Sequence, residues 1–254
     1  MSAFHVPAAG GRLSFGELPG REPAVVFIHG LGASAAQAYD DVARRPPFLA
    51  HRRILVDLFG FGESDHPSSF SYSIEDHAAS VAALLDHLCL RDVVLVGHSM
   101  GGAAAIVVAR ARPDLLSRLI LAEAHLDAVA GSISGAVLSG SEQEFAGSGQ
   151  AALARRCEEE GAASYAAAIR RADPAGMYRS ARSLVAPRTP TFREMLLGLS
   201  LLVSFLFGGN NESDPDVAWL PAHGIPVRVV PDAGHDIMNH QPAAFAAALA
   251  AILE

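Results

Sequence analysis

Short apolar runs alternate with helix-like segments through the first half of the chain, and this alternation constrains the fold more than any other feature. Helix-like segments at 73–90 and 100–116 separate the later runs, and Ser73 is a suitable N-cap for the first of them. This alternation builds a parallel sheet with helices on both faces, so the sequence predicts an α/β fold. The runs with the features of buried strands are AVVFIHG at 24–30, RRILVDLFG at 52–60, DVVLVGHS at 92–99 and LSRLILAEA at 116–124.

The alternation lapses after His125. Residues 126–191 contain helix-like segments and loops of small residues, without a convincing strand. Strand signals return in LLVSFLFGG at 201–209 and IPVRVVPDAGH at 225–235, and a helix begins near Pro242. A helical block between two strands of one sheet is typical of a cap over the carboxyl edge of that sheet. We therefore expect a core formed by residues 1–125 and 192–254, with a helical cap at 126–191.

Size and charge narrow the class of protein. A chain of 254 residues with 50% hydrophobic residues can bury the core of one α/β domain. Its 19 Lys and Arg residues against 27 Asp and Glu residues give a net charge of -8, the wrong sign for binding phosphate backbones or anionic lipid. The most apolar stretch, at 195–209, is interrupted by Gly198, Ser200 and Ser204 and is shorter than a membrane-spanning helix. We expect no nucleic-acid and no membrane partner.

The first residues contain neither a basic segment nor a continuous apolar segment. The sequence therefore predicts no secretory signal and a cytoplasmic location. Cys89 and Cys157 are too few for a disulfide framework. Histidines and cysteines do not show the spacing of a metal site, so we expect neither a metal nor another cofactor. The sequence leaves a monomer and a homodimer open.

A serine stands between glycines where a predicted strand meets a predicted helix. The segment GHSMG at 97–101 matches the motif G-x-S-x-G in the strand–turn–helix context that this motif requires. Strand and helix pass close together at such a turn, which is why its flanking residues are small. The strained turn lifts the serine hydroxyl clear of the sheet, and the following helix N-terminus offers N–H groups to a developing oxyanion. We therefore predict that Ser99 is a nucleophile.

A serine nucleophile needs a general base within hydrogen-bond reach. Of the 11 histidines, His235 follows the last predicted strand, at the sheet edge where Ser99 emerges and where open α/β sheets form active sites. We expect His235 to be this base and His98 to point away from the hydroxyl of Ser99. The loop FIHGLGAS at 27–34 offers the N–H of Leu31 as an oxyanion donor beside that of Met100. His29 is expected to brace this loop.

The order of these motifs resembles that of the α/β-hydrolase fold superfamily over essentially the whole chain. The motifs are HGLG at 29–32, DLFGFGES at 57–64, GHSMGG at 97–102 and AGH at 233–235. The resemblance implies an eight-stranded, mostly parallel sheet with helices on both faces, a Ser–His–acid triad and a helical cap after the sixth strand. It does not imply a particular reaction, because one fold hosts many activities.

The sequence departs from the commonest pattern of that superfamily at the acid of the triad. In that pattern the acid is an aspartate after the seventh strand. Here the region reads FLFGGNNESDPD at 205–216, so Glu212 or Asp214 would have to reach back. Glu123 instead follows the apolar run of the sixth strand directly, where a charge is costly unless it has a partner. A subset of the superfamily has its acid at this place. We expect Glu123 to complete the triad, with Asp214 ahead of Glu212 as alternatives.

These motifs predict cofactor-free hydrolysis of a carboxylic ester or lactone through an acyl-enzyme on Ser99. A serine in place of an aspartate at the turn argues against the haloalkane dehalogenase and epoxide hydrolase branches. The alternatives are C–C bond hydrolysis, a lyase or a perhydrolase activity with the same triad, and a small-molecule binding protein on a hydrolase scaffold. We expect an apolar substrate lining, which fits a hydrophobic acyl or ring part. Its expected residues are Leu31, Met100, Met177, Tyr178 and Met238.

Overall fold

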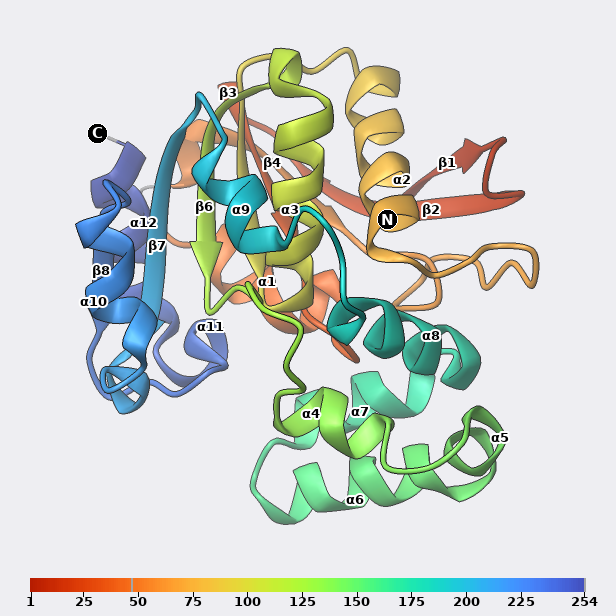
Figure 1. Cartoon of the computed structure of the whole chain (residues 1–254). Helices are drawn as coiled ribbons and strands as arrows, with labels where there is room; N and C mark the ends of the chain where they lie inside the picture. Colours follow the sequence, from red (N-terminus) through yellow and green to blue (C-terminus); the bar gives the residue numbers. More distant parts are fainter. Residues whose placement is uncertain (47, 254) are drawn as a thin grey trace.

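A computed structural model describes residues 1–46 and 48–253 and contains an eight-stranded sheet in the order β1-β2-β4-β3-β5-β6-β7-β8 (Figure 1). The β1–β2 and β2–β4 pairs are antiparallel and the other neighbours are parallel, which confirms the predicted mostly parallel sheet. Residues 47 and 254 belong to the core range expected from the sequence but lie outside the described residues. The strands are β1 Ser2–Val6, β2 Gly11–Leu18, β3 Arg21–Ile28, β4 His51–Val56, β5 Val93–His98, β6 Leu116–Ala122, β7 Leu202–Gly208 and β8 Val227–Val230.

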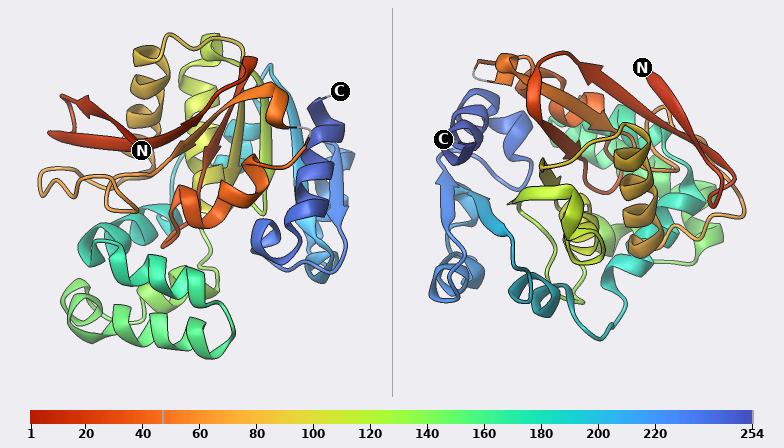
Figure 2. Two further views of the ribbon diagram at one scale, coloured as in Figure 1. Left: turned by 180° about the vertical axis from the view of Figure 1, so that it is seen from behind. Right: turned by 90° about the horizontal axis from the view of Figure 1, so that it is seen from above.

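Helices cover both faces of the sheet (Figure 2). Alternate residues of β5 face opposite layers: Leu95 packs in the cluster that contains α2 and α3, and Val94 and Val96 pack in the cluster that contains α1 and α12. Because both sides of the strand are buried, residues 93–96 of β5 are all apolar. These core helices are α1 Ala35–Ala43, α2 Ile74–His87, α3 Met100–Ala111, α9 Phe192–Leu197, α10 Pro215–Ala222, α11 Ile237–His240 and α12 Pro242–Leu253.

Two local predictions are confirmed. The side chain of Ser73 accepts a hydrogen bond of 3.1 Å from the backbone N–H of Asp76, so it caps α2. The strand predicted at 201–209 is β7, which follows the end of α9. None of the described helices is long and apolar enough to cross a membrane, which is a separate finding. The β1–β2 pair was not located from apolar runs, because most of β1 is exposed.

A group of helices lies between β6 and β7 in the sequence, and we call residues 132–185 the helical insertion. Figure 1 shows these helices together beyond the carboxyl ends of the central strands. The described residues of 126–191 contain no strand, whereas α9 already packs against α3 of the core. The division of the chain into two domains stays a prediction. The helices of the insertion are α4 Ser132–Val137, α5 Glu142–Glu144, α6 Gln150–Glu159, α7 Ala163–Arg171 and α8 Pro174–Val185, with a single π-helical turn at Phe145–Gly149.

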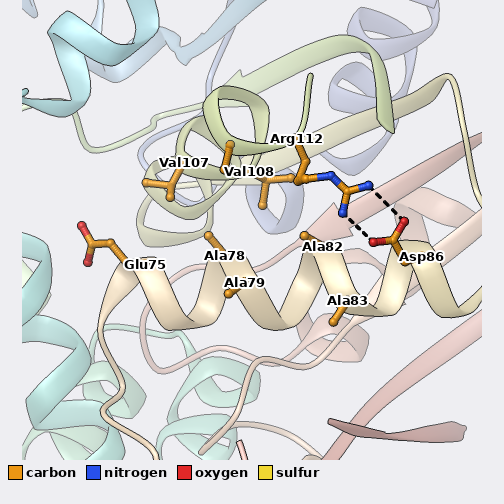
Figure 3. Close-up of a pocket in the computed structure, with 10 residues that line it drawn as sticks. Glu75, Ala78, Ala79, Ala82, Ala83, Asp86, Val107, Val108 and Arg112 are labelled. Atoms are coloured by element: carbon orange, nitrogen blue, oxygen red, sulfur yellow. Dashed lines mark hydrogen bonds and ion pairs between the residues drawn. The ribbon is translucent and has the colours of Figure 1, made fainter. Parts of the chain in front are cut away.

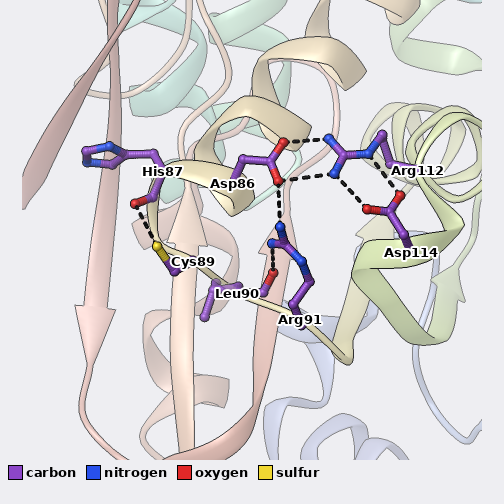
Figure 4. A network of polar contacts seen from close by, with 7 residues as sticks. All are labelled: Asp86, His87, Cys89, Leu90, Arg91, Arg112 and Asp114. Atoms are coloured by element: carbon purple, nitrogen blue, oxygen red, sulfur yellow. Dashed lines mark hydrogen bonds and ion pairs between the residues drawn. The ribbon is translucent and has the colours of Figure 1, made fainter.

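A shallow groove of about 340 Å³ separates α2 from α3 on the surface (Figure 3). Its floor consists mainly of alanine and valine, and an ion pair between Asp86 and Arg112 bridges one end. Figure 4 shows that Asp86 also pairs with Arg91, and Arg112 with Asp114. Exposed pairs of this kind contribute little to stability. The described residues that line this groove include no nucleophile beside a base, so the groove is not a candidate catalytic site.

Candidate active site

Ser99 lies at the turn between β5 and α3 in a conformation that non-glycine residues rarely adopt, with φ 50° and ψ -116°. Its N–H donates to the carbonyl of Ala122 at 3.0 Å, which extends the β5–β6 ladder to the turn itself. A side chain at Gly101 would place its Cβ 2.4 Å from the carbonyl oxygen of His29, so only glycine allows β3 and α3 to approach this closely. These contacts give the strained strand–turn–helix geometry that the sequence predicted.

Ser99 and His235 line one pocket of about 430 Å³, a size typical of small-molecule sites. The core contributes Leu31 and Asn211 to its wall, and the helical insertion contributes residues such as Tyr165. No hydrogen bond joins the Ser99 hydroxyl to the imidazole of His235 among the described residues. Catalytic hydrogen bonds are often long in a free enzyme and tighten only with substrate.

His235 follows β8 and faces a buried carboxylate. Its Nδ1 atom lies 3.4 Å from Oε2 of Glu123, and 54% of the His235 side chain is exposed against 6% of the Glu123 side chain. The other carboxylate oxygen of Glu123 accepts hydrogen bonds from the N–H of Gly208 at 2.8 Å and from Nδ2 of Asn211 at 3.0 Å. The carboxylate, which follows β6, is therefore held by groups at or after the ends of the next two strands, β7 and β8.

The surroundings of Glu123 favour its charged form. Burial raises the pKa of this carboxyl group, but the hydrogen bonds from His235, Gly208 and Asn211 outweigh burial and bring the pKa below its ordinary value. A carboxylate that stays ionised can fix the Nδ1–H tautomer of a neighbouring imidazole and stabilise the imidazolium.

The two alternative acids lie elsewhere. Asp214 accepts a hydrogen bond of 2.9 Å from the N–H of Asp216 and so caps α10, and Glu212 is exposed. Neither residue lines the pocket. From the sequence, the asparagines after β7 indicate only that an acid is lacking there. Asn211 instead orients Glu123 from the place where the commonest family pattern has its aspartate, and only the adjacency of β6 and β7 could have indicated this.

The loop after β3 is braced by His29, as the sequence predicted. His29 Nδ1 donates to the carbonyl of Gly30 at 2.8 Å, and Nε2 accepts from the N–H of Leu58 at 3.1 Å. Burial lowers the pKa of His29, which keeps the ring neutral and this pattern of donor and acceptor intact. The N–H groups of Leu31 and Met100 donate to no other group in the part of the chain that the structure describes.

His98 supports the loop that carries His235. Its Nε2 atom donates to the carbonyl of His235 at 2.9 Å, and the two rings are 4.9 Å apart. Burial lowers the pKa of His98 to about 3, so the ring is neutral at physiological pH. The sequence predicts that His98 points away from the hydroxyl of Ser99, but it gives no sign of this contact with a residue 137 positions away.

The pocket wall differs from the substrate lining expected from the sequence. Of the expected residues, Leu31 lines the pocket, whereas Met100, Met177 and Met238 are buried in the core clusters and do not. Tyr178 donates its hydroxyl to the carbonyl of Gly140 within the insertion and does not line the pocket either. For Met177 and Tyr178 the difference arises because the rotation of α8 about its axis cannot be read from its sequence. The insertion instead contributes Ile133, Cys157, Glu160, Ala162, Tyr165 and Leu184.

We expect Glu123→Gln to be less stable than the wild type above about pH 5 and to approach it in acid. The pKa of Glu123 in the folded protein is below that of an unfolded glutamate, about 4.3. Its stabilising contribution is therefore complete above the unfolded pKa and is lost as the pH falls through the folded pKa. Denaturant unfolding of both proteins across this pH range measures the difference.

The exposed Glu212 provides a control, since Glu212→Gln should track the wild type at every pH. A stability difference for Glu123→Gln that does not change with pH would contradict the lowered pKa.

Comparison with known proteins fits this geometry. Residues 23–160, more than half of the chain, match the model of the family described as the α/β hydrolase fold. A relative from Mus musculus, the sn-1-specific diacylglycerol lipase ABHD11, is 39% identical over 102 residues, which are 40% of this chain and 32% of that protein. The chain thus matches about a third of the length of that curated relative.

Two solved structures resemble the whole chain. A thermophilic esterase from Thermogutta terrifontis has a TM-score of 0.79 and 26% identity, and the match covers 96% of this chain and 93% of the esterase. The N-acyl homoserine lactonase AidH, complexed with N-butanoyl homoserine, has a TM-score of 0.77 and 22% identity, with 100% and 96% of the two chains covered. With its motif order, its sheet and the family match in agreement, the chain belongs to the α/β-hydrolase fold family.

Proposed function

We propose that the protein is a serine hydrolase that cleaves a carboxylic ester or lactone. The observation that carries the proposal is a serine on a strained turn that shares one pocket with a histidine whose Nδ1 atom lies 3.4 Å from a buried carboxylate. The likeness to the Thermogutta terrifontis esterase over nearly the whole chain supports chemistry on esters.

In the proposed mechanism, Ser99 attacks the substrate carbonyl while His235 accepts the hydroxyl proton. Glu123 holds the imidazole by its Nδ1–H and stabilises the imidazolium that forms. The N–H groups of Leu31 and Met100 receive the oxyanion. His235 then returns the proton to the leaving alcohol, and water repeats the cycle on the acyl-enzyme. These steps use the chain's own groups and require no cofactor.

We propose an uncharged substrate with a hydrophobic acyl or ring part. The pocket wall contains Leu31, Ile133 and Leu184, and none of its described residues is a lysine or arginine that would pair with an anionic group. Because Ile133 and Leu184 belong to the segment 126–191, we further propose that this segment is a cap that sets substrate choice.

Ser99→Ala should lose several orders of magnitude in turnover and should no longer be labelled by a fluorophosphonate, because the attacking oxygen is gone. Intact-protein mass spectrometry detects the covalent adduct, and a panel of p-nitrophenyl esters of increasing chain length together with lactones measures turnover. Ser139→Ala is a matched control, because Ser139 is exposed and its hydroxyl only donates to the carbonyl of Ala136. Labelling that persists in Ser99→Ala would show that another residue is the nucleophile.

Glu123→Gln should lower kcat by ~10³–10⁴ with little change in KM, because the imidazole loses the carboxylate that fixes its tautomer. Asp214→Asn should have a mild effect, since Asp214 caps α10 and does not line the pocket. Steady-state kinetics on the best ester of the panel compare the two variants. If Asp214→Asn loses kcat and Glu123→Gln does not, the acid of the triad is a residue after β7.

A further inference from the structure

A tyrosine of the helical insertion holds the loop that carries the proposed oxyanion donor. Tyr165 lies on α7, and its hydroxyl donates to the carbonyl of Leu31 at 2.7 Å across 134 positions of sequence. Burial raises the pKa of this hydroxyl, so it remains a neutral donor over the physiological pH range. This hydrogen bond joins the insertion directly to the loop after β3.

Packing at the next residue reinforces this contact. Gly32 has a φ of 75°, and a Cβ built there would lie 2.8 Å from Cε of Met177 and 3.2 Å from both Cγ1 of Ile169 and the hydroxyl of Tyr165. These three side chains belong to α7 and α8 of the insertion. The insertion thus rests directly on the loop, and the positive φ of Gly32 favours glycine at this contact.

The loop is therefore fixed from two sides at consecutive peptide groups. From the core, His29 binds the carbonyl of Gly30, whose peptide group contains the N–H of Leu31. From the insertion, Tyr165 binds the carbonyl of Leu31, which belongs to the following peptide group. Together the two hydrogen bonds restrain the backbone on both sides of the Leu31 Cα atom. An oxyanion donor stabilises the transition state only if it is already oriented before the reaction.

We propose that Tyr165 is a positioning residue that couples docking of the helical insertion to the orientation of the Leu31 N–H. This inference rests on the proposed function. When the insertion lies on the core, both hydrogen bonds hold the loop and the oxyanion site is complete. When the insertion lifts, the Leu31 carbonyl is released and the donor loses its fixed direction. A substrate that contacts both walls of the pocket would then complete the site as it binds.

The expected loss of kcat is smaller than the loss caused by removing a whole oxyanion donor. Removing one oxyanion donor lowers kcat by ~10²–10³. Tyr165→Phe loosens such a donor without removing it, because His29 still holds the preceding peptide group. We therefore expect a loss of about tenfold to hundredfold in kcat and an unchanged KM, since a group that acts only in the transition state changes kcat alone.

The test compares Tyr165→Phe with Tyr178→Phe. Tyr178 is a matched control, because it also belongs to the insertion and donates its hydroxyl to a backbone carbonyl, that of Gly140, but does not line the pocket. Kinetics on the best ester of the panel give kcat and KM for both variants. A trifluoromethyl ketone, which forms an oxyanion adduct with the nucleophile, gives an inhibition constant that depends on the oxyanion site. Thermal unfolding shows whether each variant is folded.

In Tyr165→Phe, kcat should fall and the inhibition constant of the trifluoromethyl ketone should rise by a similar factor, while Tyr178→Phe resembles the wild type. The inference is overturned by an unchanged kcat, by an effect confined to KM, or by an equal loss in Tyr178→Phe. Failure of the proposed function would look different, because the wild type itself would then hydrolyse no ester or lactone and take up no fluorophosphonate.

Discussion

The buried carboxylate of Glu123 is the interaction on which the arrangement of the site depends. A charge this far from water is tolerated only when several groups donate to it. Two of its donors are Gly208, the last residue of β7, and Asn211, which follows β7. The third is His235, which follows β8. Glu123 itself follows β6. One buried charge therefore ties together the ends of three adjacent parallel strands, and the histidine is held where the sheet brings those ends to one edge.

Backbone strain at this edge follows a common pattern. Ser99 and Glu123 both have positive φ, 50° and 47°, and each directly follows a strand. Each also donates its N–H to the neighbouring strand, Ser99 to Ala122 and Glu123 to Leu206. The sheet ladder thus continues one residue past the strand and holds a backbone conformation that would otherwise be unfavourable. These hydrogen bonds to the sheet hold both residues in the strained conformation. They thereby fix the positions from which the side chains of Ser99 and Glu123 extend.

Sequence reasoning succeeded where one local signal determines the structure. Central strands such as β5 are largely apolar because helices cover both faces, and Glu123 stands out because a charge after an apolar run needs a partner. It failed where the outcome depends on the packing of distant segments. The role of Asn211 requires that β6 and β7 be neighbours, and the expected contact of Met177 with substrate depended on the rotation of α8.

The charge of the pocket is consistent with the direction of the proposed reaction. Glu160 and Asp236 line it, and the described lining residues include no lysine or arginine. Burial raises the pKa of Asp236, although hydrogen bonds from Asn239 act in the opposite direction. An uncharged ester enters such a pocket without an electrostatic penalty, whereas the acid that hydrolysis releases ionises near these carboxyl groups. Burial disfavours the charged form of Asp236, and the described lining offers no lysine or arginine that would pair with the released acid. In the proposed reaction, the same lining therefore fits a neutral substrate better than its ionised product.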